Sequence, residues 1–216
     1  SSRLENARIL DIGVGRGRTT QYLLPKAAEY TGLDYVPEFI ERVKKKYQIG
    51  NFIVGDARDL NEFEDEAFDF VLFSFNGIDA VSHGDRLRIL REMHRVLKKG
   101  GMIMFSSHNR DYRHFRRPYW LMEPKFSASF AKNLLSYVYF LPRHFQMRKL
   151  EIFNDEYAIV NDQDHRFSLL VYYIGIGQQI KQLEDIGLSD VKAYNMRGDR
   201  VTADKDSFWI YYLATK

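Results

Sequence analysis

The sequence predicts an α/β fold in which helices cover a doubly wound, mostly parallel sheet. Short apolar segments alternate with amphipathic segments through the first half of the chain, the pattern of parallel strands joined by right-handed crossovers. Residues 68–74 are nearly all apolar, as expected of a strand that is buried on both faces. A length of 216 residues allows one sizeable core. The absence of cysteine excludes a disulfide scaffold, a cysteine zinc site and a cysteine nucleophile.

Each element has a local signal. Pro25 shortens the helix expected from Thr19, and Pro37 suits the first turn of the next helix. Ser82 caps the third helix at its start, and Gly100-Gly101 end it. A later helix is expected at 178–186. The expected strands are 8–12, 30–34, 51–55, 68–74, 102–106, 156–160, 166–173, 191–194 and 208–214.

The alternation breaks in the middle of the chain, where residues 110–150 hold nine basic and two acidic residues, a net charge of +7 against +3 for the whole chain. We therefore expect a main domain formed by 1–109 with 174–216, and an inserted lid of helix and β-strands at 110–173 that binds a second ligand. Residues 110–150 are expected to form a helical cover over the ligand of the main domain. A basic insert in an acidic body indicates an anionic partner, although a solvated charged face is the alternative.

The chain shows no apolar run long enough to span a bilayer. Its first residues, Ser1 to Glu5, lack the apolar core of a signal peptide. They also lack Met, which is consistent with a missing natural N-terminus. The expected location is cytoplasmic, and the oligomeric state is left open.

A glycine-rich turn follows the first expected strand and reads Asp11-Ile12-Gly13-Val14-Gly15-Arg16-Gly17. Glycines at a strand-to-helix turn let the backbone approach a ligand closely. A dinucleotide site requires Gly-x-Gly-x-x-Gly, whose last position is Arg18 here. Asp11 would repel a pyrophosphate and attract a cationic, amine-bearing ligand.

Two further acids end the next two strands. Asp34 lies where a carboxylate can accept hydrogen bonds from ribose hydroxyls, and Asp56 is placed to accept one from an adenine amino group. Isolated strand-end aspartates are usually turn or capping residues. Three acids at neighbouring strand ends beside a glycine loop favour a ligand site instead.

These motifs resemble those of the class I S-adenosylmethionine-dependent methyltransferases, with a Rossmann-like sheet of seven strands. The resemblance covers residues 7–107 and returns near 175–216, and it implies S-adenosylmethionine as the cofactor and S-adenosylhomocysteine as the product. By this likeness Asp11, Gly13 and Gly15 hold the methionine end, Asp34 with Tyr35 the ribose, Asp56 with Ala57 the adenine, and Ser74 and Phe75 lie beside the methionine portion. The sequence departs from the family at Lys99, where Pro is usual, and in lacking a helix before the first strand.

Methyl transfer needs at most a base that takes the acceptor's proton. The candidates are His108, His165 and Tyr173, with His83 as a weaker one. His108 follows the fifth expected strand and should face the cofactor crevice. No histidine spacing predicts a metal site.

The expected acceptor is a small anionic molecule, such as an anionic or nucleotide-linked sugar, because arginines suit phosphate or carboxylate groups. One alternative is an RNA-nucleotide methyltransferase that stacks bases on aromatic residues of the insert. Those residues are Tyr112, Phe115, Tyr119, Trp120 and Phe126. Others are a membrane-surface enzyme acting on lipid through 130–140, and an inactive module, against which the intact acids argue.

Overall fold

The computed structural model describes residues 4–122, 125, 127–163 and 165–216. Its strands are β1 (Ala7–Ile12), β2 (Ala27–Asp34), β3 (Asn51–Val54), β4 (Phe68–Phe73), β5 (Leu97–Asn109), β6 (Ile152–Phe153), β7 (Tyr157–Val160), β8 (Val171–Ile174), β9 (Ser189–Tyr194), β10 (Arg200–Val201) and β11 (Trp209–Thr215). Its helices are α1 (Thr20–Leu23), α2 (Pro37–Lys46), α3 (His83–Val96), α4 (Ala128–Met147) and α5 (Ile176–Glu184), with short 3-10 turns η2 (Gly77–Asp79), η3 (Tyr119–Leu121) and η4 (Arg148–Leu150).

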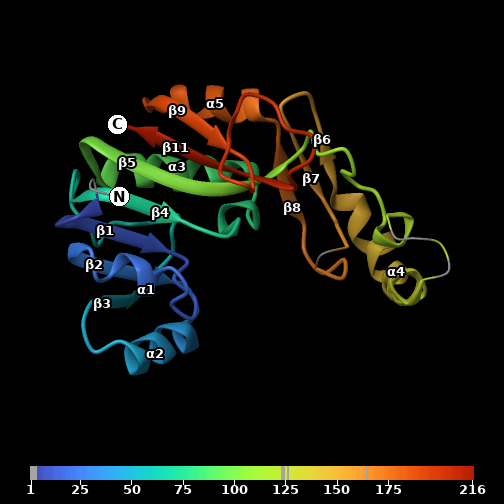
Figure 1. Ribbon diagram of the computed structural model, residues 1–216, viewed down its shortest axis with the longest axis horizontal. Helices are drawn as coiled ribbons and strands as arrows, with labels where there is room; N and C mark the ends of the chain where they lie inside the picture. Colours follow the sequence, from blue (N-terminus) through green and yellow to red (C-terminus); the bar gives the residue numbers. More distant parts are fainter. Residues whose placement is uncertain (1–3, 123–124, 126, 164) are drawn as a thin grey trace.

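The strands form one sheet in the order β10-β9-β11-β5-β4-β1-β2-β3 (Figure 1). The pairs from β3 to β5 are parallel, while β11 lies antiparallel between β5 and β9. The expected doubly wound fold with a mostly parallel central sheet is therefore confirmed, although the described residues form eleven strands and not the expected seven. The β6–β8 meander extends the sheet, because β8 pairs with the far end of β5.

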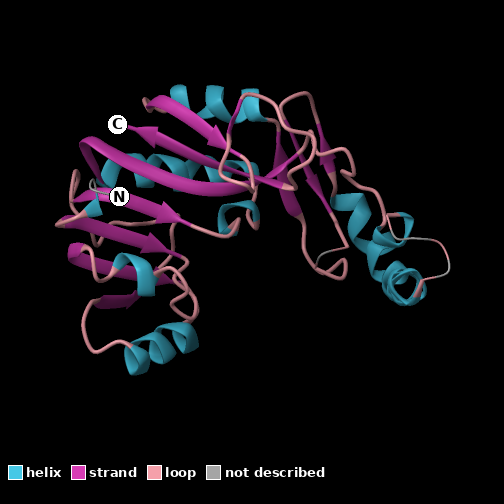
Figure 2. Cartoon of the chain, viewed as in Figure 1, coloured by secondary structure: helices cyan, strands magenta, loops and turns pink. Residues whose placement is uncertain are grey.

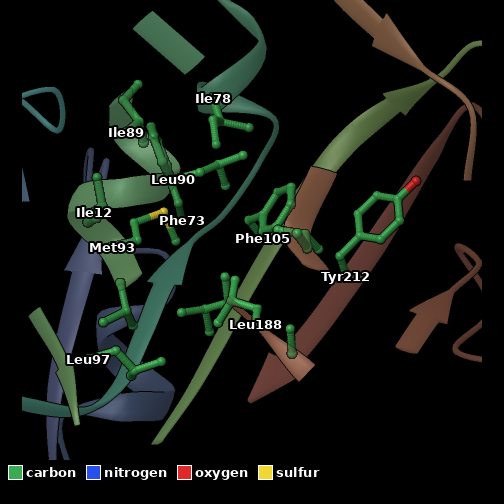
Figure 3. Packing of buried hydrophobic residues seen from close by; sticks show 14 of the residues in the cluster. Ile12, Phe73, Ile78, Ile89, Leu90, Met93, Leu97, Phe105, Leu188 and Tyr212 are labelled. Carbon is green, nitrogen blue, oxygen red and sulfur yellow. The ribbon is translucent and has the colours of Figure 1, made fainter. Parts of the chain in front are cut away.

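Alternating side chains of the central strands feed two apolar cores, and helices lie on both faces of the sheet (Figure 2). On one face α3 and α5 pack on β4, β5 and β11. Figure 3 shows Phe73, Leu90, Met93 and Phe105 of this core, all buried. On the other face α1 and α2 cover β1 to β3. Helices thus pack on both faces of the sheet and fix the positions of the loops at the carboxyl ends of its parallel strands.

Two strands differ most from their predicted boundaries. The strand expected at 166–173 begins only at Val171, because Arg166 and Phe167 adopt left-handed φ values of 52° and 56° in a turn. The strand expected at 102–106 runs from Leu97 to Asn109. Pairing with β8 and β11 extends it, so His108 lies within β5 rather than after it.

The insert carries α4, which stands at the opposite end of the molecule from β3 and α2 (Figure 1). This confirms a helix in the basic segment that the sequence set apart. Phe126, Asp164 and the side chain of Trp120 lie outside the described part of the chain. Over that described part, no helix combines the length and apolar character needed to cross a membrane.

Candidate functional site

A cavity of about 800 Å³ opens at the carboxyl ends of β1 to β4. Its volume is in the range of small-molecule and cofactor sites. Eight of the residues that the sequence assigns to a cofactor line this cavity, namely Gly13, Gly15, Asp34, Tyr35, Asp56, Ala57, Ser74 and Phe75. The ninth, Asp11, lies buried behind the glycine loop.

The glycine-rich loop after β1 has a backbone conformation that favours glycine at three positions. Gly13, Gly15 and Gly17 have φ values of +68°, +53° and +77°, a region that residues with a Cβ avoid. A Cβ at Gly13 would also lie 3.0 Å from the ring of Phe73. The Gly13 N–H donates to the Leu33 carbonyl at 2.8 Å, which ties the loop to β2. The backbone therefore forms one wall of the cavity without side chains in the way.

Asp11 is fully buried beneath this loop. Its Oδ2 accepts hydrogen bonds from the Thr19 hydroxyl at 2.5 Å and the Tyr30 hydroxyl at 2.7 Å. Its Oδ1 is buried and finds no hydrogen-bond partner among the described residues. Burial raises the pKa of the Asp11 carboxyl to about 6, although the two hydroxyls oppose this. An unpaired carboxylate oxygen in this place suits a cationic group entering above it.

Asp34, at the end of β2, bridges two loops. Its Oδ2 accepts from the Gly15 N–H at 2.8 Å, and its Oδ1 accepts from the Val36 N–H at 3.0 Å, at the start of α2. Asp34 therefore does act as a turn residue through Oδ1, the role that the sequence offered as the alternative to ligand binding. Each carboxylate oxygen accepts two hydrogen bonds, so both retain capacity toward the cavity that Asp34 lines.

Asp56, after β3, has a partner that the sequence did not predict. The Arg58 guanidinium holds it through Nη2 at 2.6 Å and Nε at 3.0 Å, both to Oδ2. Arg58 also donates its backbone N–H to Oδ1 at 2.9 Å. These bonds keep the pKa of Asp56 below its usual value. Asp56 is therefore ionised and oriented before any ligand arrives.

The turn after β4 is strained. Phe75 and Asn76 both have left-handed φ values, 62° and 57°, which cost about 1–3 kcal/mol each for residues other than glycine. The Asn76 N–H donates to the Ser106 hydroxyl at 2.9 Å, which holds the turn on β5. The Arg18 guanidinium lies 3.6 Å from the centre of the Phe75 ring, so the rim of the cavity is formed by a cation–π pair.

His108 lies directly behind this rim and is 6% exposed. Its Nδ1 is 2.8 Å from Asp79 Oδ2, which also accepts the His108 N–H at 2.7 Å. Nδ1 therefore carries the proton, and Nε2 keeps a lone pair, toward which the Asn76 amide nitrogen points at 3.4 Å. The imidazole sits between the rings of Tyr173 and Phe208, with centroids 5.0 and 5.2 Å away.

Asp79 is in turn held by Arg86, a fully buried arginine of α3. Neither residue was predicted from the sequence. Arg86 also donates to Ser107 Oγ at 3.1 Å and Gln179 Oε1 at 2.5 Å. The available signal was spacing, because Arg86 precedes Ile89, Leu90 and Met93 by three, four and seven residues and so shares their face.

The other predicted bases lie elsewhere. The Tyr173 hydroxyl donates to Asp162 Oδ2 at 2.7 Å and points away from the cofactor cavity, into the insert. His165 belongs to the turn before β8, with Nδ1 3.4 Å from Asp162 Oδ1. His83 stacks on Tyr157 at 4.2 Å, and burial lowers its pKa. His108, by contrast, contacts the turn behind the cofactor rim through Asn76.

The insert has a cavity of its own, of about 90 Å³, which Tyr173, Arg116 and His144 help to line. Within the described chain, no residue of 110–173 lines the larger cavity. The expectation of a helical lid over the cofactor is therefore not met in this structure, because α4 projects outward from the sheet (Figure 1). Closure on binding an acceptor stays a prediction.

Comparison with known proteins agrees with this geometry. The methyltransferase domain family model matches residues 10–105. A demethylmenaquinone methyltransferase of Bacillus velezensis is 31% identical over 180 residues, 76% of each chain. One of Thermotoga maritima is 38% identical over 99 residues, 45% of this chain and 42% of its own length.

Solved structures show the same fold. An S-adenosylmethionine-dependent methyltransferase of Methanosarcina mazei matches with a TM-score of 0.62 at 18% identity, over 98% of this chain and 93% of that one. One of Mesorhizobium loti matches with a TM-score of 0.62 at 15% identity, over 99% and 93%. The chain is an enzyme that uses S-adenosylmethionine, and it belongs to the class I S-adenosylmethionine-dependent methyltransferase family.

Proposed function

We propose that this enzyme methylates a small, flat aromatic acceptor that carries a hydroxyl group, of the reduced-quinone class. The observation that carries the proposal is the His108–Asp79 pair, set among aromatic rings directly behind the cofactor rim. The names of the Bacillus velezensis and Thermotoga maritima relatives, demethylmenaquinone methyltransferases, support this acceptor class.

The residues at the cavity fit the cofactor. The unpaired Asp11 Oδ1 and the backbone of Gly13 and Gly15 would receive the methionine end, with Ser74 and Phe75 beside it. Asp34 with Tyr35 would bind the ribose, and Asp56 with Ala57 would frame the adenine. When bound, S-adenosylmethionine supplies an electrophilic methyl group on a sulfonium.

His108 would act as the base. Its Nε2 lone pair takes the hydroxyl proton of the acceptor, which raises the electron density on the ring oxygen and the neighbouring ring carbon. Asp79 orients the imidazole and stabilises the imidazolium that forms. The rings of Tyr173, Phe208 and Phe115, the last 4.9 Å from Tyr173, pack around the imidazole and exclude water from it, and such an apolar aromatic wall suits an aromatic acceptor.

An anionic acceptor, including a nucleotide-linked sugar, is the second candidate. It is favoured by Arg116 and Arg117, which line the insert cavity, although Arg116 already lies 3.4 Å from Glu151. The RNA alternative is weaker, because Phe115 and Tyr112 pack on Tyr173 and Phe208 instead of standing free to stack bases. Residues 1–109 with 174–216 would carry the cofactor, and 110–173 the acceptor.

Acceptor competition tests the proposal. The enzyme with labelled S-adenosylmethionine should methylate a short-chain demethylmenaquinone kept reduced by dithionite, with one methyl group added per molecule by mass spectrometry. A nucleotide-linked sugar and a single-stranded RNA serve as comparison acceptors. Methylation of the sugar nucleotide with none of the quinol would assign the second candidate and reject the first.

Asp34→Asn tests the cofactor site. It replaces one carboxylate oxygen with a donor, and hydrogen bonds to a charged group are worth about 1.5–3 kcal/mol. We expect S-adenosylmethionine binding to weaken by about ten-fold to more than a hundred-fold in calorimetry. Because Asp34 also accepts from Gly15 and Val36, a small loss of melting temperature should accompany it.

The matched control is Asp59→Asn, which changes an exposed aspartate that follows β3 and does not line the cavity. It should leave cofactor affinity unchanged. Affinity that survives Asp34→Asn would place the ribose elsewhere and leave Asp34 as a turn residue.

A further inference from the structure

The helix α4 is attached to the protein along one side only. Its 20 residues include none that is buried. The inner side rests on the 161–170 turn, where Phe167 lies 5.6 Å from Tyr137 and 4.6 Å from His144 between ring centres. His144 Nδ1 also lies 3.1 Å from the side-chain Oδ1 of Asn161. These contacts fix the helix and leave its opposite side uncovered by the described protein.

That outer side is apolar. Leu135, Val138, Tyr139 and Phe145 are 70%, 56%, 78% and 56% exposed. The first three are spaced by three and four residues and therefore form one stripe. Large apolar side chains grouped on a surface mark an interaction site. The helix is not among those long and apolar enough to cross a membrane, so the stripe would lie on an apolar partner rather than pass through it.

The charge around the stripe identifies the partner. Residues 128–150 contain Lys132, Arg143, Arg148 and Lys149 and no aspartate or glutamate. All four basic residues are exposed. Arg166 adds a further cation next to the helix, 5.8 Å from the Phe140 ring centre. An apolar stripe with an aromatic residue and flanking cations is the pattern of a helix that lies in the plane of an anionic bilayer surface.

A second copy of the chain fits this surface less well. Packing two α4 helices through the stripe would bring Lys132 and Arg143 close to the same residues of the other copy, with no acidic residue in either helix to pair with them. Nucleic acid would satisfy the cations and leave the apolar stripe in water. A bilayer with anionic headgroups satisfies both features.

We propose that α4 docks this enzyme on the surface of anionic membranes. The docking would also orient the site, since β8 of the same insert pairs with β5 at His108 and Tyr173. The acceptor side of the enzyme would then be held next to the lipid surface. This inference rests on α4 and not on the identity of the acceptor.

Vesicle flotation tests it. The full chain is mixed with phosphatidylcholine vesicles, either pure or containing phosphatidylglycerol. We expect binding to the anionic vesicles that is at least about ten-fold stronger than to the neutral ones and that falls with added salt. Leu135→Ser/Val138→Ser/Tyr139→Ser should weaken binding by at least about ten-fold. Arg143→Glu/Lys149→Glu should weaken it by about twenty-five-fold or more, at about five-fold for each basic residue.

The control is Tyr22→Ser/Ile49→Ser, which removes apolar residues that are 68% and 69% exposed but lie on the main domain, away from α4. It should bind vesicles as the parent does. All variants should keep the parent's circular dichroism spectrum and S-adenosylmethionine affinity. Loss of quinol methylation with vesicle binding intact would count against the proposed function alone.

Three outcomes would overturn the docking proposal. They are equal binding to neutral and anionic vesicles, vesicle binding that the α4 variants do not change, and no vesicle binding at all. In the last case, light scattering that shows a dimer lost in the serine variants would assign the surface to a second copy. Salt-sensitive binding to an RNA oligomer would assign it to nucleic acid.

Discussion

His108→Asn is expected to lower kcat for methylation of the reduced short-chain quinone by about 10²–10⁴-fold, the usual contribution of a general base. Asparagine is the informative replacement, because its amide can still donate to Asp79 from near the position of Nδ1 and offers nothing basic at the position of Nε2. Affinity for S-adenosylmethionine should not change, since His108 does not line the cofactor cavity.

The melting temperature separates a base from a structural residue. His108→Asn should lower kcat while it keeps the parent's melting temperature, because its amide still reaches Asp79. The controls are His165→Ala and Tyr173→Phe, the two other predicted bases, whose polar atoms face Asp162 instead of the cofactor rim. If Tyr173→Phe abolishes activity and His108→Asn does not, the base is Tyr173.

The cofactor side of the site was predictable from sequence for a physical reason. Gly13, Gly15, Asp34 and Asp56 are placed by the ends of neighbouring parallel strands, and that order follows from the alternation of strands and helices along the chain. Local sequence therefore determines which residues meet. The glycine spacing also reports a backbone conformation directly, because only glycine adopts these φ values without strain.

The acceptor side was not predictable in this way. His108, Asp79 and Arg86 come from β5, η2 and α3, and Asp79 joins them by contacting both His108 and Arg86. The one sign of this cluster in the local sequence was the position of Arg86, a charged residue on the apolar face of α3. His165 stays a prediction: it lies in the turn before β8 with Nδ1 3.4 Å from Asp162 Oδ1, and the left-handed residues at 166 and 167 delay the start of the strand that follows it.

Arg86→Met is expected to destabilise the protein by about 3–5 kcal/mol, the cost of leaving one partner of a buried ion pair alone. Arg86 and Asp79 are 0% and 1% exposed at their side chains. Without the guanidinium, Asp79 keeps the Ser107 hydroxyl and the His108 N–H and imidazole, but no fixed positive charge. Urea unfolding measures the free energy, and the melting temperature should fall by about 6–20 °C at this chain length.

The exposed Arg91→Met on the same helix is the control and should change stability by less than about 0.5 kcal/mol. The double variant Asp79→Leu/Arg86→Met then separates the charge from the packing. Removing both charges leaves no buried ion unpaired, so the double variant should be more stable than Arg86→Met alone. It should nevertheless remain slow in methyl transfer, because nothing then orients the His108 imidazole.

If Arg86→Met unfolds at the same urea concentration as Arg91→Met, the buried pair does not stabilise the fold. A double variant with full activity would remove Asp79 and Arg86 as positioning residues and leave His108 to act unaided.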